Sequence, residues 1–132
     1  MNILYCEDEE DIRDVIHSLI EDMFPDSRVT VCKNGVEGIE AIQNSIAFNL
    51  VISDNQMPSV EGKRGDGKAL FQFFRNSGHS APFVICSGCH ESEFSELLHE
   101  KNFYYLPKIK LTLDSKDFFI KILENSSSTT KA

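Results

Sequence analysis

Residues 2–11 read Asn-Ile-Leu-Tyr-Cys-Glu-Asp-Glu-Glu-Asp, a short apolar run that ends in five consecutive acidic residues. An apolar run of this length is typical of a buried β-strand. The apolar residues that follow recur at steps of three and one, which places them on one face of a helix: Ile12, Val15, Ile16, Leu19, Ile20 and Met23. The stretch therefore predicts a strand over residues 2–6, then a helix, with the acidic residues between them.

The same succession of strand and helix recurs along the chain. Further strands are expected at residues 28–32, 50–53, 82–86 and 103–106. Further helices are expected around residues 36–46, 70–74, 94–98 and 114–123, the last with Asp114 as its N-cap. The inner strands are apolar throughout, which is typical of a parallel sheet covered on both faces. We predict a doubly wound α/β domain with five strands and five helices.

Composition fits a single globular domain. Of the 132 residues, 41% are hydrophobic and 26% are charged, which is ordinary for a chain that buries its own core. We expect this domain to span residues 1–124. Residues 125–132 read Asn-Ser-Ser-Ser-Thr-Thr-Lys-Ala and carry little apolar surface, so a polar tail or the stub of a linker is expected there.

The charge and the apolar segments of the chain argue against nucleic-acid and membrane partners. Thirteen basic residues against 21 acidic residues give a net charge of −8, whereas nucleic-acid surfaces need clustered Lys and Arg. No stretch approaches the roughly 20 apolar residues that span a bilayer, and no export signal is apparent. We therefore expect no nucleic-acid partner, no membrane contact and a cytoplasmic protein. Its four cysteines are then expected to be reduced thiols: Cys6, Cys32, Cys86 and Cys89.

Reactive side chains follow the predicted strands at their carboxyl ends, where open parallel sheets bind ligands. These residues are Glu7 and Asp8 after the first strand, Asp54 after the third, Ser87 after the fourth and Lys108 after the fifth. No glycine-rich phosphate loop is present, and clustered carboxylates favour a hard divalent cation such as Mg²⁺. With such a cation Asp54 is a candidate nucleophile toward a phosphoryl group. Lys108 would neutralise charge on the phosphoryl oxygens, and Ser87 would hydrogen-bond the product.

This ordered set of residues resembles the receiver domains of two-component response regulators, including the stand-alone chemotaxis-type regulators. Those domains typically have an acidic pair, an acceptor Asp followed by x-x-Met-Pro, a Ser or Thr, and a Lys at successive strand ends. The matching residues here are Glu7 and Asp8, Asp54 with Met57-Pro58, Ser87 with Gly88, and Lys108. The resemblance covers residues 2–123 and implies a flavodoxin-like fold with strand order 2-1-3-4-5.

The resemblance also implies a function and a ligand set. Asp54 would accept a phosphoryl group from a histidine kinase or a phosphotransfer protein. Asp8, Asp54 and the backbone carbonyl of Gln56 would bind Mg²⁺ with help from Glu7, and Lys108 would pair with the phosphoryl group. The transfer is catalysed by the domain itself, so the protein would not be an enzyme in the turnover sense.

In such domains a Ser and an aromatic residue report the phosphorylation. The resemblance assigns these switch positions to Ser87 and Tyr105. A downstream protein target would then bind the face made by the fourth helix, the fifth strand and the fifth helix.

Two features depart from the family pattern. Pro107 precedes Lys108 and Ile109 follows it, whereas the family usually has Pro directly after the lysine. If Asp66-Gly67 takes the place of the family's Asp-Gly before the third helix, the preceding loop is about five residues longer and includes Lys63-Arg64. This basic pair either lies in a solvated loop or faces the phosphorylation site or a partner.

Parts of the sequence also fit other functions. A pseudo-receiver that docks proteins without being phosphorylated is the main alternative, because of the altered Lys108-Ile109 step and the long loop before the third helix. The string Cys86-Ser87-Gly88-Cys89-His90 matches haem attachment, and its Cys-x-x-Cys also allows a redox pair, although carboxylates nearby disfavour a thiolate. These cysteines with His90 or His79 lack the paired spacing of a structural zinc site. A haloacid-dehalogenase-like phosphatase would need a second Asp where Gln56 stands.

Overall fold

A five-stranded parallel sheet forms the centre of the protein, which we describe from a computed structural model covering residues 1–44 and 47–131. The strands lie in the order β2-β1-β3-β4-β5. They are β1 (Asn2–Cys6), β2 (Arg28–Cys32), β3 (Leu50–Ser53), β4 (Phe83–Ser87) and β5 (Phe103–Pro107). The three inner strands are almost entirely buried, as their continuous apolar sequences require. The predicted fold class and strand order are confirmed.

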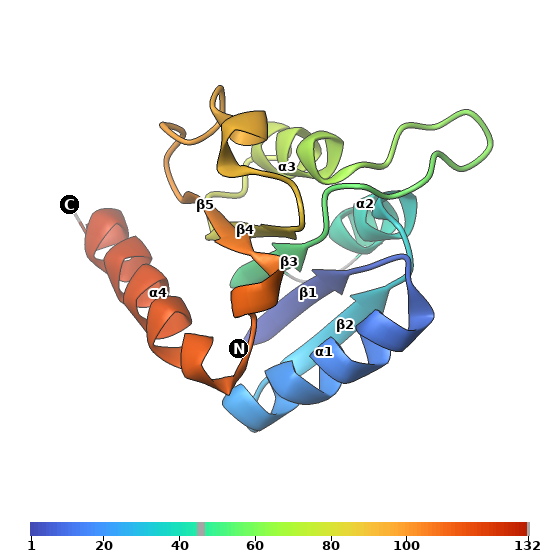
Figure 1. Cartoon of the computed structure of the whole chain (residues 1–132). Coiled ribbons are helices and arrows are strands. Elements are labelled where there is room, and N and C mark those ends of the chain that lie inside the picture. Colours follow the sequence, from blue (N-terminus) through green and yellow to red (C-terminus); the bar gives the residue numbers. More distant parts are fainter. Residues whose placement is uncertain (45–46, 132) are drawn as a thin grey trace.

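Helices cover both faces of the sheet (Figure 1). They are α1 (Glu10–Met23), α2 (Gly35–Asn44), α3 (Gly67–Asn76) and α4 (Lys116–Lys131). Because side chains alternate along a strand, Leu4 and Val51 pack with α2 and α3, whereas Ile3 and Ile52 pack with α1 and α4. Each face therefore has its own core. Within the described residues, no helix is long and apolar enough to cross a membrane.

The helix expected around residues 94–98 is not an α-helix, so the described chain has four α-helices rather than five. The segment forms one 3-10 turn, η1 (Glu91–Phe94), followed by further turns. The buried residues Phe94 and Leu97 are three positions apart, a spacing that a 3-10 turn satisfies as well as an α-helix does. His90 caps the turn, because its ring accepts the Ser92 N–H at 3.1 Å.

The last helix also begins differently from the prediction. Asp114 is not its N-cap but lies inside a 3-10 turn, η3 (Leu113–Ser115), where its N–H donates to the Thr112 hydroxyl. The helix α4 starts at Lys116 and buries Phe119 and Ile122 most deeply. A Thr hydroxyl caps as an Asp carboxylate does, so the local sequence allowed either residue.

The predictions for the C-terminal residues and for the end of the second helix are only partly tested by the structure. The backbone of α4 continues to Lys131, past the expected end of the domain at residue 124, because no Gly or Pro follows to end the helix. Whether residues 125–132 serve as a linker stays a prediction. Ile46, in the helix predicted over 36–46, and Ala132 lie outside the described residues.

The long loop between β3 and α3 contains a tight hairpin and projects away from the sheet (Figure 1). Val60 and Lys63 exchange two backbone hydrogen bonds, of 3.1 and 2.9 Å. Glu61 and Gly62 between them both have positive φ, as a two-residue hairpin turn requires. Arg64 is paired with Asp66 at 2.9 Å, and Asp66 in turn caps α3 through the Ala69 N–H.

A contact between two glycines holds this loop against α2. A Cβ on Gly35 would lie 1.9 Å from the carbonyl oxygen of Gly65, and a Cβ on Gly65 would lie 2.9 Å from the Val36 nitrogen. Both positions therefore have to be glycine for the backbones to approach this closely.

Gly35→Ala should destabilise the protein, because the new methyl group overlaps a backbone oxygen that cannot move away as a side chain can. We expect the free energy of unfolding to fall by about 2–4 kcal/mol. Gly88→Ala is the matched control: its new methyl group would point into open space, with nothing it could meet within 4 Å, so a change within about 0.5 kcal/mol is expected. Urea unfolding monitored by circular dichroism measures both, and equal stability of the two variants would contradict this reading.

Candidate functional site

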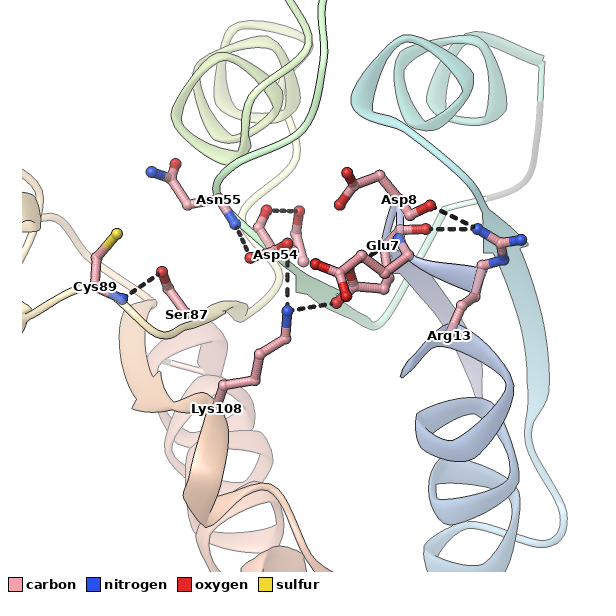
Figure 2. A network of polar contacts seen from close by, with 10 residues as sticks. Glu7, Asp8, Arg13, Asp54, Asn55, Ser87, Cys89 and Lys108 are labelled. Atoms are coloured by element: carbon pink, nitrogen blue, oxygen red, sulfur yellow. Dashed lines mark hydrogen bonds and ion pairs between the residues drawn. The ribbon is translucent and has the colours of Figure 1, made fainter. Parts of the chain in front are cut away.

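Acidic residues gather where β1 and β3 end side by side (Figure 2). The register pairs Cys6 with Ser53, so the residues that follow, Glu7 and Asp54, leave adjacent strands at the same level. Backbone hydrogen bonds continue past the strand ends: the Asp54 N–H donates to the Cys6 carbonyl at 3.0 Å, and the Glu7 N–H donates to the Cys32 carbonyl at 3.1 Å. The sheet itself therefore fixes both carboxyl groups.

Lys108 enters this cluster from the end of β5 and joins the two carboxylates. Its Nζ lies 2.7 Å from Glu7 Oε1 and 3.4 Å from Asp54 Oδ2. Figure 2 shows the lysine pointing between them. The lysine begins the short turn η2 (Lys108–Lys110), so the altered sequence around Pro107 still delivers its ammonium group to the acidic cluster.

Asp8 completes a group of three carboxylates. One oxygen each from Glu7, Asp8 and Asp54 lies within 4.8 Å of the others. Three negative charges face the single Lys108 ammonium, and oxygen ligands in this number and spacing suit a hard divalent cation. The residues present therefore fit Mg²⁺.

Burial shapes the acidity of the cluster. Glu7 is 1% exposed and Asp54 is 8% exposed. Burial, with the Glu7 charge as the next cause, raises the pKa of Asp54 to about 6, although Lys108 acts in the opposite direction. Burial also raises the pKa of Asp8. Burial lowers the pKa of Lys108, but its bonds with Glu7 and Asp54 outweigh this and raise that pKa overall, so the ammonium stays charged.

Three supporting residues were not predicted from the sequence. The Asn55 N–H donates to Asp54 Oδ1 at 2.8 Å, and the Gly67 N–H donates to the Asn55 carbonyl at 2.8 Å. A Cβ on Gly67 would lie 2.7 Å from the Asp54 carbonyl oxygen, so only glycine fits there. Arg13 donates to the carbonyls of Glu7 and Asp8 at 3.0 and 3.3 Å. Only Gly67 had a sequence signal, as part of the Asp66-Gly67 pair before α3.

Ser87 and Tyr105 meet at the backbone of a third residue, Cys89. Ser87 is buried at the end of β4, and its hydroxyl accepts the Cys89 N–H at 3.0 Å. The Tyr105 hydroxyl donates to the Cys89 carbonyl, and its ring packs on Phe94. Both side chains therefore hold the loop after β4, and neither contacts the acidic cluster through a hydrogen bond among the described residues.

Gln56 is the one predicted ligand for which no contact with the cluster is found in the described part of the chain. Its side chain is exposed in the loop after β3, and its assignment as a ligand through the backbone carbonyl stays a prediction. The next residue, Met57, is buried against the core under α2 and α3, which anchors this part of the loop.

Asp54→Asn should stabilise the metal-free protein above pH 6. Folding raises the pKa of Asp54 from the ordinary value of 3.8 to about 6, so the charged form opposes folding. This penalty is fully present above pH 6 and disappears as the pH falls toward 3.8. Asparagine avoids it, which corresponds to a gain of about 1–3 kcal/mol.

Unfolding in urea with a chelator present, at pH 7.5 and at pH 4.5, measures the effect. Asp66→Asn is unsuitable as a control because Asp66 caps α3, whereas Asp117→Asn changes an exposed carboxylate in the first turn of α4. A stabilisation by Asp54→Asn that stays the same at both pH values would contradict the electrostatic explanation.

Comparison with known proteins identifies the family. The sequence profile of the response regulator receiver domain matches residues 3–113. A search of curated protein sequences found no significant match.

Solved structures share the fold. The receiver domain of the hybrid histidine kinase CckA is 26% identical, with a TM-score of 0.69 over 93% of this chain and 98% of that one. A CheY-like receiver domain protein from Methanospirillum hungatei is 22% identical, with a TM-score of 0.70 over 98% and 96% of the two chains. The response regulator TrrA from Thermotoga maritima, solved with Mg²⁺-BeF, is 20% identical, with a TM-score of 0.70 over 92% and 97%. The chain thus belongs to the receiver domain family of response regulators.

Proposed function

We propose that this receiver domain takes a phosphoryl group onto Asp54 from a histidine kinase or phosphotransfer protein, and that the modification changes its binding to a downstream protein. The observation that carries the proposal is the placement of Lys108 between Glu7 and Asp54, beside Asp8. These four side chains come from the ends of three strands, β1, β3 and β5. An ion pair with a purely structural role would need one carboxylate and one ammonium group, not three carboxylates around one lysine.

In the proposed transfer, an Asp54 carboxylate oxygen attacks the phosphorus atom of a phosphohistidine. The new O–P bond forms as the P–N bond breaks, and the imidazole nitrogen keeps the electron pair and takes up a proton from solvent. Lys108 neutralises charge on the transferred oxygens, since its Nζ already lies 3.4 Å from Asp54. One phosphoryl group is accepted per chain, so the domain is the substrate of its own chemistry and not an enzyme in the turnover sense.

Mg²⁺ is the cofactor that the site fits. Asp8, Asp54 and the Gln56 carbonyl would hold it, with Glu7 assisting, and it would supply positive charge next to the phosphoryl oxygens. The three clustered carboxylates support this proposal. The structure of TrrA was solved in complex with Mg²⁺-BeF, which supports Mg²⁺ as the ion to test first.

Incubation with acetyl phosphate and Mg²⁺ should add one phosphoryl group to the wild-type protein and none to Asp54→Asn. Intact-mass spectrometry measures the adduct, and a chelator should prevent it. A protein phosphohistidine donor is the second arm, because some receivers are selective. If neither donor modifies the wild type, the alternative of an unphosphorylated docking module replaces the proposal; an adduct that persists in Asp54→Asn would move the site elsewhere.

An apolar groove next to the acidic cluster supports a protein as the phosphoryl donor. The groove has a volume of about 620 Å³, lies between α1 and η2, and includes Lys108. Two of its lining residues are among the exposed large apolar side chains of the described chain, Val15 at 67% and Ile109 at 88%. Exposed apolar residues at the edge of a reactive site are typical of a protein contact. We propose that the donor protein binds here.

Ile109→Asp should slow phosphoryl transfer from a protein donor by about tenfold or more while leaving transfer from acetyl phosphate unchanged. The charge disrupts an apolar contact with the donor but touches none of the reacting groups. Leu98→Asp is the matched control, because Leu98 is also exposed and apolar but lies outside the groove. Single-turnover transfer assays separate the two donors, and equal losses with both would mean that Ile109 acts on the site itself.

The downstream target is proposed to bind the face of η1, β5 and α4. This is the face predicted from the sequence for the downstream target, except that the 3-10 turn η1 takes the place of the expected fourth helix and α4 is the expected fifth helix. Ser87 and Tyr105, the proposed switch residues, both hold Cys89 at the start of that face. A phosphoryl group that recruits the Ser87 hydroxyl would release the Cys89 N–H and so alter this loop.

A further inference from the structure

Tyr5 carries a buried hydroxyl that has no hydrogen-bond partner among the described residues. The side chain is 2% exposed, and its oxygen is the buried side-chain polar atom that this part of the chain leaves unsatisfied. Buried polar groups are nearly always paired, so an exception calls for a physical explanation.

Tyr5 lies on the strand that leads into the acidic cluster, on the same face as the first residue of that cluster. Tyr5 lies on β1 two residues before Glu7, and residues two apart on a strand share a face. It belongs to the core that α1 and α4 cover, together with Ile52 and Cys86. Burial raises the pKa of Tyr5, and the charges of Glu7 and Asp54 raise it further, so the hydroxyl stays protonated and can act as a donor.

The Glu7 carboxylate is compensated by a single cation in the described structure. Its Oε1 accepts Lys108 Nζ at 2.7 Å and its Oε2 accepts the Glu9 N–H at 3.2 Å. Among the described residues, Lys108 is the only cation that pairs with this carboxylate. Glu7 would only assist in holding Mg²⁺, so its almost completely buried Oε1 would lose its hydrogen-bond donor if Lys108 turned toward a phosphoryl group on Asp54.

We propose that Tyr5 is a positioning residue whose hydroxyl donates a hydrogen bond to Glu7 when Lys108 turns to the phosphoryl group. The proposal rests on the function proposed above. It gives the unpaired hydroxyl a role: when Lys108 leaves Glu7 Oε1, that buried oxygen loses its donor, and the Tyr5 hydroxyl can replace it. The tyrosine would thereby favour that state without touching the reacting atoms.

Tyr5→Phe tests this role because it removes only the hydroxyl. With Mg²⁺ and beryllofluoride as the probe, calorimetry should show an affinity about tenfold to a hundredfold weaker than that of the wild type, as expected for a lost hydrogen bond to a charged group. The thermal midpoint of the unloaded variant should be unchanged or higher, since the hydroxyl is unsatisfied in that state. A purely structural role would lower it.

A second readout follows the hydroxyl directly. The chain has three tyrosines, and the ring ¹³C resonance next to the Tyr5 oxygen should shift when the wild-type protein is loaded. Tyr104→Phe is the matched control: Tyr104 lies on β5 and packs on Phe118, so its loss should leave probe affinity unchanged.

The outcomes separate the two proposals. A wild type that binds the probe, with Tyr5→Phe binding it equally well, overturns the role of Tyr5 and leaves the proposed function standing. A wild type that neither binds the probe nor accepts a phosphoryl group overturns both. Weaker binding by Tyr5→Phe, with unloaded stability preserved and Tyr104→Phe unaffected, supports the role.

Discussion

One ammonium group, that of Lys108, makes the acidic end of this sheet possible. Glu7 and Asp54 are both buried, and two carboxylates at neighbouring strand ends repel one another. Lys108 lies within 4 Å of both and compensates part of this charge. The compensation is incomplete, because Asp8 adds a third carboxylate and the pKa of Asp54 remains raised. The fold therefore holds an excess of negative charge that a cation would relieve, and this excess costs stability when no cation is bound.

The parallel sheet is what brings these groups together from distant parts of the sequence. Parallel strands end at the same edge, so Glu7 and Lys108, which are 101 positions apart in the sequence, become neighbours. Close backbone contacts then fix the details. Gly67 packs on the Asp54 carbonyl, and Gly65 packs on Gly35 at the start of α2, so the long loop between β3 and α3 is held at both helices. The middle of this loop is folded into a hairpin at Val60 and Lys63.

The sequence was most informative where a pattern has one physical solution. Continuous apolar runs predicted the inner strands, and β-branched residues predicted β2. The residues that follow the strands predicted the proximity of Asp54 and Lys108. The prediction failed where two solutions have similar energy, since the spacing around Phe94 suits an α-helix or a 3-10 turn. Some residues act through contacts with other helices or strands, and the sequence around them does not predict such contacts. Arg13 has the sequence character of an ordinary helix position, yet it binds backbone carbonyls of the acidic cluster. Tyr5 resembles any strand residue, and its burial without a partner in the described chain depends on what packs around it.

The helix expected around residues 94–98 is replaced by the 3-10 turn η1, and this bears on how a signal could leave the site. Among the described residues, the backbone of the segment from Gly88 to Asn102 is paired mainly by short-range turn hydrogen bonds. Further contacts come from the buried Phe94 and Leu97, the two bonds at Cys89 and the Lys68–Glu96 ion pair at 2.9 Å, and Arg75 holds the far end of the segment through the Lys101 and Asn102 carbonyls. Segments with few backbone hydrogen bonds and little buried surface open at low free-energy cost. A change at Ser87 would therefore act first at Cys89, at the start of this segment, where short turns and not a full helix have to rearrange. Tyr105 holds the carbonyl of the same residue whose N–H Ser87 holds. Loss of one bond would therefore weaken the geometry of the other, and the two proposed switch residues would be coupled through the peptide units on either side of Cys89.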